Sequence, residues 1–165
     1  MSETLAESFD WLAAPKAQIM IIGSMPGIAS LKQQQYYAHP RNAFWPIMQK
    51  IFNWPELDYA SRCQALVNEN IALWDVLRRC QRRGSLDSGI DASSLEINDF
   101  EAFFQQHPAI TKVLFNGGKA AQLFRRHVKA PARISMQQLP STSPAHAAMS
   151  FQKKLDKWRM AIRPN

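Results

Sequence analysis

The chain has 165 residues, of which 46% are hydrophobic, so it can bury one core but is too short for two ordinary domains. We therefore expect a single domain over residues 1–165. Lys and Arg exceed Asp and Glu by 20 to 13, and the net charge of +7 suits a polyanionic partner such as nucleic acid. Because many basic proteins bind no nucleic acid, charge alone leaves both alternatives open.

The apolar runs and the first residues predict where the protein works. The run from Ile19 to Ile22 ends far short of the roughly 18–20 residues needed to cross a membrane. Residues 1–12, MSETLAESFDWL, are acidic where a secretory signal has positive charge and an apolar stretch. We expect a cytoplasmic protein, and we expect it to be a monomer.

Cysteine and histidine spacing argues against a metal site. The two cysteines, Cys63 and Cys80, form no CxxC motif, and no histidine lies at metal-ligand spacing from them. This pattern fits neither a disulfide framework nor a zinc site. We expect no metal site.

Four segments rich in Ile, Val and Leu predict strands, because each is followed by Gly, Pro or Ser and then by a helical pattern. They are residues 18–23, 70–76, 111–116 and 133–139. The second is the least defined, since Trp74 to Arg79 could equally begin a helix. The alternation of strands and helices predicts an α/β fold with a mainly parallel sheet.

Helical patterns fill the intervals between these segments. Helices are predicted near residues 42–52, 57–68, 99–106 and 119–128. Near the C-terminus, apolar residues recur at spacings of three and four, which predicts one buried helix face. They are Ala148, Phe151, Leu155, Trp158 and Ile162. Basic residues on the other side predict a solvated face. They are Lys153, Lys154, Lys157 and Arg159.

Residues 81–94 form the one long polar connection, and a loop of this length in a compact domain is often functional. Arginines lead into it. They are Arg78, Arg79, Arg82 and Arg83. Such a basic stretch could bind DNA phosphates, with Arg82 and Arg83 as the candidates, or it could be an exposed linker.

Three loops should share one edge of the sheet. Ligands of parallel sheets bind outside the carboxyl ends of the strands. At those ends the sequence places GSMPG (23–27), NGG (116–118) and PSTSP (140–144). Ser143 and Pro144 suit the N-cap and first position of a helix, and helix starts with small hydroxyls can bind an anionic group. Capping alone explains each residue, but three converging loops favour a pocket.

The segment YYAHPRNAFW (36–45) adds aromatic rings to this edge. Tyr36 and Tyr37 are adjacent and cannot both point into the core, which leaves one ring to stack on a base. Phe44 and Trp45 are predicted to be core residues.

Two polar residues of the same segment have alternative interpretations. His39 could be a general base, but a packed histidine that donates to backbone is favoured. Asn42 could cap the following helix or hold a water through its amide. Asp75 is the only acidic residue expected near the sheet edge, and a structural role is as consistent with its position as a chemical one.

The segments GSMPGIASLKQQQYYAHPRNAFW, FNGGKAAQLF and LPSTSPAHA resemble the active-site motifs of the uracil-DNA glycosylase superfamily. Their combination is most similar to the hypoxanthine-DNA glycosylase branch, also called DNA-deoxyinosine glycosylase. The likeness spans residues 18–149. It implies an α/β/α sandwich around a four-stranded parallel sheet, and a cofactor-free enzyme that flips a damaged base out of DNA and cuts its N-glycosidic bond.

The resemblance also implies roles for individual residues. Gly23, Ser24 and Met25 bring the first turn to the base, and Tyr37 stacks on it. Asn116 stands at the strand end from which this branch reads the edge of the base, and we expect it to form a hydrogen bond to the leaving hypoxanthine. The second motif, with Ser141, Thr142 and Ser143, holds the phosphates beside the flipped nucleotide.

Met25 departs from the pattern of many relatives, which carry Asp or Asn there to position the attacking water. The hypoxanthine branch is thought to use the asparagine of its HPxNxFW segment, which is Asn42 here. Ser141 and Thr142 stand where uracil enzymes have a histidine, which counts against uracil as the main substrate. The alternatives are a mismatch-type uracil glycosylase, a non-catalytic DNA-binding relative and, with less support, a small-molecule α/β enzyme, since neither GxGxxG nor a P-loop is present.

Overall fold

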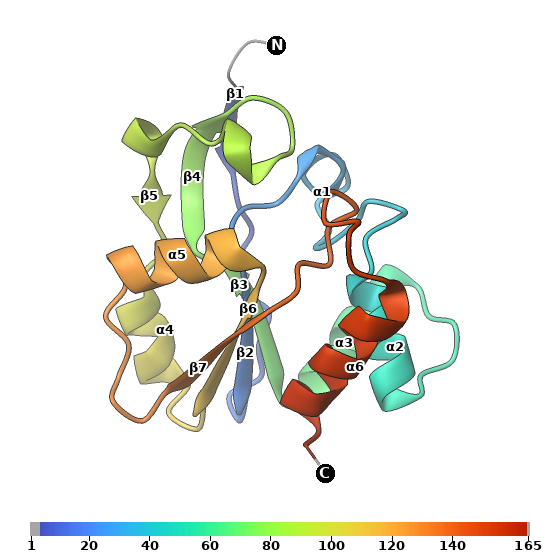
Figure 1. The fold of residues 1–165 in the computed structure, drawn as a ribbon. Helices are drawn as coiled ribbons and strands as arrows, with labels where there is room; N and C mark the ends of the chain where they lie inside the picture. Colours follow the sequence, from blue (N-terminus) through green and yellow to red (C-terminus); the bar gives the residue numbers. More distant parts are fainter. Residues whose placement is uncertain (1–3, 165) are drawn as a thin grey trace.

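The protein was analysed as a computed structural model, which describes residues 4–164. Four parallel strands form the central sheet in the order β3-β2-β6-β7 (Figure 1). Their bounds are β2 (Ile19–Gly23), β3 (Ile71–Asp75), β6 (Lys112–Asn116) and β7 (Ser135–Leu139). All four predicted strands are confirmed, including the second. The apolar runs of β2, β3 and β6 follow from burial of the sheet on both faces.

Helices cover both faces of this sheet, so the predicted α/β/α sandwich is confirmed (Figure 1). One layer holds α4 (Phe100–Gln106) and α5 (Gly118–His127), packed in a core cluster with Trp74 and Phe115. The other holds α2 (Phe44–Phe52), α3 (Tyr59–Asn68) and α6 (Phe151–Ile162), packed around Trp158. A short helix, α1 (Ile28–Gln33), follows the first turn and was not predicted. No helix within residues 4–164 is long and apolar enough to cross a membrane.

The C-terminal helix begins later than the sequence predicts. Ser150 caps α6 by accepting a hydrogen bond from the Lys153 backbone N–H, whereas Ser143 accepts one from Ala145 within a turn. The prediction of a helix starting at Pro144 is therefore wrong. The chain turns repeatedly between residues 143 and 148 instead.

Three side chains of this region also lie differently from the prediction. Ala148 precedes the helix and is exposed, and Phe151 is 41% exposed in its first turn. Lys154 is buried, because its ammonium turns back to donate to the His146 carbonyl over 2.7 Å. Leu155, Trp158 and Ile162 form the buried face as predicted.

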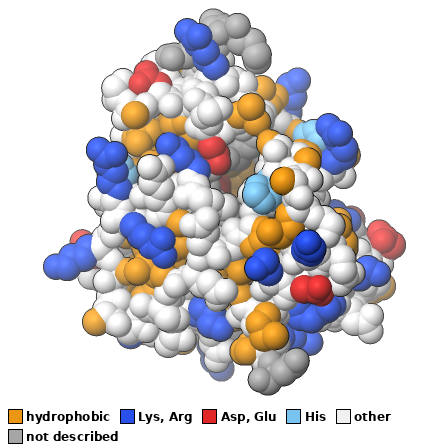
Figure 2. Space-filling view, in the orientation of Figure 1, with side chains coloured by type: hydrophobic (Ala, Val, Ile, Leu, Met, Phe, Trp, Pro, Cys, Tyr) orange, Lys and Arg blue, Asp and Glu red, His pale blue; other side chains and the backbone are white. Residues whose placement is uncertain are grey.

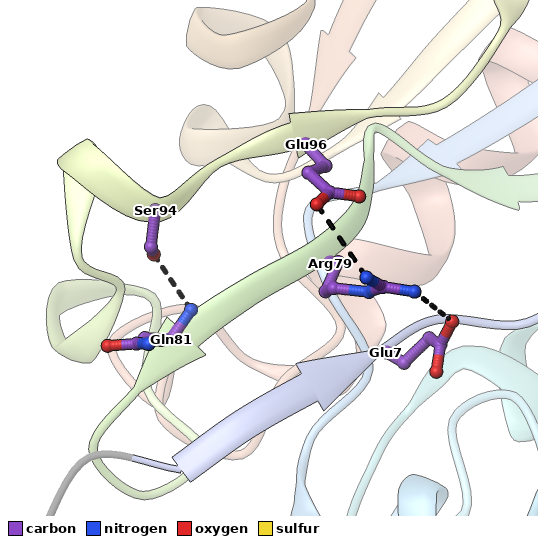
Figure 3. A network of polar contacts seen from close by, with 5 residues as sticks. All are labelled: Glu7, Arg79, Gln81, Ser94 and Glu96. Carbon is purple, nitrogen blue, oxygen red and sulfur yellow. Dashed lines mark hydrogen bonds and ion pairs between the residues drawn. The ribbon is translucent and has the colours of Figure 1, made fainter.

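A second, antiparallel sheet lies beside the upper edge of the first and was not predicted (Figure 1). It contains β1 (Thr4–Glu7), β4 (Leu77–Arg82) and β5 (Glu96–Ile97), in the order β1-β4-β5. Arg79 on β4 contacts a carboxylate on each neighbouring strand, Glu7 at 3.0 Å and Glu96 at 3.7 Å (Figure 3). Next to it, the Gln81 N–H donates to Ser94 Oγ. Arg79 thus pairs with carboxylates of its own sheet.

Candidate active site

A cavity of about 770 Å³ lies beyond the carboxyl ends of the central strands. Its walls come from the first turn, the segment around residues 36–42, the loop of residues 85–88 and the second-motif loop of residues 141–146. Figure 2 shows a hollow on this face, with an acidic side chain on one side of it and a histidine on the other. The predicted convergence of loops at this edge is confirmed, and the volume falls in the range of roughly 300–1,000 Å³ common for ligand sites.

Most of the predicted site residues line this one cavity. They are Gly23, Ser24, Met25, Tyr37, Asn42, Asn116, Ser141, Thr142 and Ser143. Met25 is 7% exposed and also belongs to the core cluster under the turn. Within residues 4–164 no group of metal-ligating side chains gathers.

Arg82 and Arg83 do not line the cavity. Arg82 is only 2% exposed, and its guanidinium donates to the Pro26 carbonyl over 2.7 Å. The prediction that Arg82 reaches DNA phosphates is therefore not supported, because β4 turns this side chain inward under the first turn. Arg83 is exposed, one residue further along the chain.

The loop after β4 is attached to the first turn by hydrogen bonds across a long stretch of sequence. Ser24 Oγ donates to Asp87 Oδ1 over 2.6 Å, and the Ile28 N–H donates to Ser85 Oγ over 2.8 Å. Asp87 begins a short 3₁₀ helix, η1 (Asp87–Gly89), and lines the cavity. The long polar connection is thus part of the cavity wall rather than a free linker.

Asn116 links the end of β6 to the second motif. Its Nδ2 donates to Thr142 Oγ1, and its Oδ1 accepts from the Thr142 N–H, both over 2.9 Å. Thr142 itself is 1% exposed. The amide of Asn116 therefore holds the second-motif loop in place. Asn116 also lines the cavity, and its amide can form further hydrogen bonds there.

Asn42 and His39 lie on the opposite wall. Asn42 Oδ1 accepts from the Phe44 N–H over 2.9 Å, as in an Asx turn at the start of α2, which leaves the Asn42 amide nitrogen for other partners. His39 is exposed, and its Nδ1 accepts from the Arg41 N–H over 3.0 Å. The favoured interpretation of His39 as a packed donor is therefore wrong.

Tyr37 and Tyr36 separate as the sequence predicts. Tyr36 is 5% exposed and donates to the Asp10 carbonyl, whereas Tyr37 is half-buried and lines the cavity. Phe44 backs the Tyr37 ring in a stacked arrangement, with 4.3 Å between centroids. Tyr37 holds a left-handed backbone conformation, with φ of 54°. This conformation is strained for a residue other than glycine, and the Tyr37 hydroxyl lies beside Gly23, buried and without a hydrogen-bond partner within the described chain.

Asp75 ends β3 at the inner end of the same cavity. It is 3% exposed, and its Oδ2 likewise has no hydrogen-bond partner among the described residues. Burial and, after it, the charge of Asp87 raise the pKa of the Asp75 carboxyl to about 7, against the opposing effect of the Arg82 guanidinium. Burial, followed by the charge of Asp75, also raises the pKa of Tyr37 against a smaller opposing effect of the nearby Asn116 side chain, which lies outside hydrogen-bonding geometry, so the Tyr37 hydroxyl stays protonated.

The space over Gly23 shows how closely these groups approach. A methyl group added to Gly23 would lie 2.5 Å from Asp75 Oδ1 and 3.0 Å from the Tyr37 hydroxyl. Only glycine leaves room for both oxygens beside the first turn. Sequence reasoning noted Asp75 without giving it a role and missed Asp87, although the carboxylate at a strand end was a usable signal for the former.

Comparison with known proteins agrees with this architecture. The Uracil DNA glycosylase superfamily model matches residues 9–163. A Hypoxanthine DNA glycosylase from Methanosarcina barkeri is 37% identical over 107 residues, covering 64% of this chain and 66% of that protein. One from Methanosarcina acetivorans is 32% identical over 150 residues, covering 88% of this chain and 90% of the relative.

The fold is also similar to a solved structure. A solution NMR structure from Methanosarcina acetivorans, provisionally named a uracil DNA glycosylase, superposes with a TM-score of 0.81 at 29% sequence identity. The superposition covers 97% of this chain and 98% of that one. The match of the family over residues 9–163, with its motifs gathered around one cavity, shows that the chain belongs to the uracil DNA glycosylase superfamily.

Proposed function

We propose that this protein is a monofunctional DNA glycosylase that hydrolyses the N-glycosidic bond of a deaminated base, chiefly hypoxanthine in deoxyinosine. The observation that carries the proposal is the cavity at the sheet edge, which gathers the motif residues of the superfamily in one place. The names of the two Methanosarcina relatives support hypoxanthine as the substrate. The net charge of +7 suits a DNA partner.

In this proposal the target nucleotide is flipped out of the duplex, at a cost of a few kcal/mol that is lowest at mismatched pairs. The base enters the cavity and stacks on Tyr37, whose ring is held from behind by Phe44. The second-motif loop, fixed to β6 through Asn116, meets the flanking phosphates with Ser141 and Ser143.

Asn42 and Asn116 are proposed to act on the reacting atoms. Within the described chain Asn42 forms a hydrogen bond only through Oδ1, at the start of α2, and its amide group orients the attacking water. Asn116 lies on the other wall, and its amide forms a further hydrogen bond to the departing base. A positioned donor of this kind is worth about 3–4 kcal/mol in the transition state, or roughly two to three decades of rate.

The test is a panel of labelled duplexes carrying hypoxanthine, uracil, xanthine or a normal base, treated with alkali to reveal abasic sites. We expect strand breaks at hypoxanthine first. Asn42→Ala and Asn116→Ala should each lower single-turnover excision by about 100-fold or more. Wild-type-like turnover by both variants would reject the assigned roles.

The rival is a DNA-binding protein that kept the scaffold without the chemistry, which the presence of Met25 in the first turn favours. Tight binding to inosine-containing duplex with no abasic product, at any enzyme concentration, would decide for the rival.

A further inference from the structure

We propose that Asp75 is the general acid of this glycosylase: its carboxyl proton passes to N7 of the flipped purine as the glycosidic bond breaks. This inference rests on the proposed function and adds to it a residue that neither motif contains. It begins from two oxygens, Asp75 Oδ2 and the Tyr37 hydroxyl, which are buried at the cavity's inner end without hydrogen-bond partners in the described chain.

Unpartnered buried polar groups destabilise a fold and are rare in native structures. Asp75 and Tyr37 lie side by side over Gly23, within 2.5 and 3.0 Å of the position a methyl group would take there. Both residues line the cavity. A ligand with nitrogen and oxygen atoms on its edge would offer hydrogen-bond partners to both groups.

The groups that face Asp75 come from every neighbouring element. Asp87 from η1 carries negative charge, Arg82 from β4 carries positive charge, and Tyr36 and Tyr37 face it from the segment before α2. Burial with an acidic neighbour outweighs the arginine, so the pKa of Asp75 lies near 7. A carboxyl kept protonated near neutral pH by its surroundings is a competent proton donor.

The step balances as a hydrolysis. The Asp75 O–H bond breaks, its proton bonds to N7 of the base, and the C1′–N9 electron pair goes to N9, so the purine leaves as a neutral molecule. Water adds to C1′ and releases its proton to solvent through the open cavity. Solvent then protonates the Asp75 carboxylate again.

The same step predicts a preference for purines. Hypoxanthine has an imidazole nitrogen that accepts this proton, whereas uracil lacks one and leaves as an anion. An ionised Asp75 would repel that anion. The buried carboxyl therefore favours a deaminated purine over a deaminated pyrimidine.

Asp75→Asn tests the acid directly on deoxyinosine duplex under single-turnover conditions. Wild-type excision should fall by about tenfold per pH unit above pH 7, because the acid must be protonated. Asp75→Asn should be slower by a factor on the order of 10²–10⁴ and should lose this alkaline decline. Its affinity for duplex containing non-cleavable 2′-fluoro-deoxyinosine should stay within about threefold of wild type, because the proton is needed only in the transition state.

Asp87→Asn provides a second test that leaves Asp75 in place. Asp87 raises the pKa of Asp75, so its neutralisation should move the alkaline decline to lower pH. The matched control is Asp91→Asn, which removes the same charge four residues later, where the side chain caps η2 (Ala92–Ser94), and should leave the decline in place.

The outcomes separate the two proposals. If wild type leaves every deoxyinosine duplex intact, the proposed function fails. If wild type excises hypoxanthine but Asp75→Asn keeps the alkaline decline, or loses duplex affinity in proportion to its rate, then Asp75 is not the acid. The same conclusion follows if Asp87→Asn leaves the pH of the alkaline decline unchanged.

Discussion

The side walls and the inner end of the cavity differ in how their polar groups are satisfied. On the side walls, the Asn42 and Asn116 amides already bond to the backbone and to Thr142. At the inner end, Asp75 Oδ2 and the Tyr37 hydroxyl bond to nothing in the described chain. The walls are thus held in shape by bonds within the chain, whereas the inner end has polar groups that no described residue of the chain satisfies.

The largest expected effect tests the inner end. At pH 8, Asp75→Asn should be more stable than wild type, by at most about 4 kcal/mol, since each pKa unit is worth about 1.4 kcal/mol. The folded protein keeps a proton to a pKa of about 7 that the unfolded chain releases near 3.8, so wild-type stability falls as pH rises between these values. Urea denaturation at pH 5 and pH 8 measures the difference.

If the difference in unfolding free energy between wild type and Asp75→Asn were the same at pH 5 and pH 8, the pKa of Asp75 would not be raised in the folded protein. Asp91→Asn is the control, since its pKa is lowered by its bonds to Ser93 and does not titrate in this window.

Gly23→Ala should disturb the inner end without touching the walls. The new methyl group would meet Asp75 Oδ1 and the Tyr37 hydroxyl, and a displacement of about 1 Å at a reacting centre costs on the order of 100-fold in rate. Single-turnover excision on deoxyinosine duplex is the measurement. Gly27→Ala is the matched control in the same turn, where the nearest atom would be Ser85 Cβ at an ordinary 3.5 Å. Equal rates for the two variants would count against a crowded inner end.

Thr142→Val tests the wall. It removes the hydroxyl that accepts from Asn116 Nδ2 but keeps the backbone N–H that donates to Asn116 Oδ1. We expect a loss of about 1–3 kcal/mol in the free energy of unfolding, because a half-buried donor loses its partner. Thr142→Ser keeps the hydroxyl and should lose less. If Thr142→Val reproduced the whole kinetic effect of Asn116→Ala, Asn116 would act only by positioning the loop.

The smallest effect is expected outside the cavity. Glu7→Gln removes one partner of Arg79 in an exposed ion pair, which is worth less than about 1 kcal/mol. Thermal unfolding in low and high salt should show a small difference that disappears with screening. Excision should not change. A loss of activity would mean that the small sheet transmits its geometry to the cavity more strongly than the contacts indicate.

The central sheet could be predicted because its strands are buried on both faces and read as apolar runs. The small sheet could not. β4 is LRRCQR, in which Leu77, Cys80 and Arg82 point inward around an irregular register, so the pattern resembles a polar loop. β1 and β5 are short and charged, and they are held by pairing with β4 rather than by their own propensity.

The candidate site divides along the same line. Residues on strand ends and motif loops could be placed from the sequence because parallel strands bring their ends together. The burial of Arg82 and the hydrogen bond of Asp87 to the first turn could not be predicted, since both depend on the path of the chain in and after β4. The start of α6 was missed because Ser143 and Ser150 both suit an N-cap, whereas in the structure Ser143 caps a turn and Ser150 caps the helix.

Gly23 and Asp75 face each other in register on neighbouring strands. The missing side chain of Gly23 makes room for the Asp75 carboxylate, so a substitution at one position should require a substitution at the other. A relative with alanine or serine in place of Gly23 should therefore carry a residue shorter than aspartate in place of Asp75. Such a protein would need a different proton donor, or would excise a base that leaves without protonation.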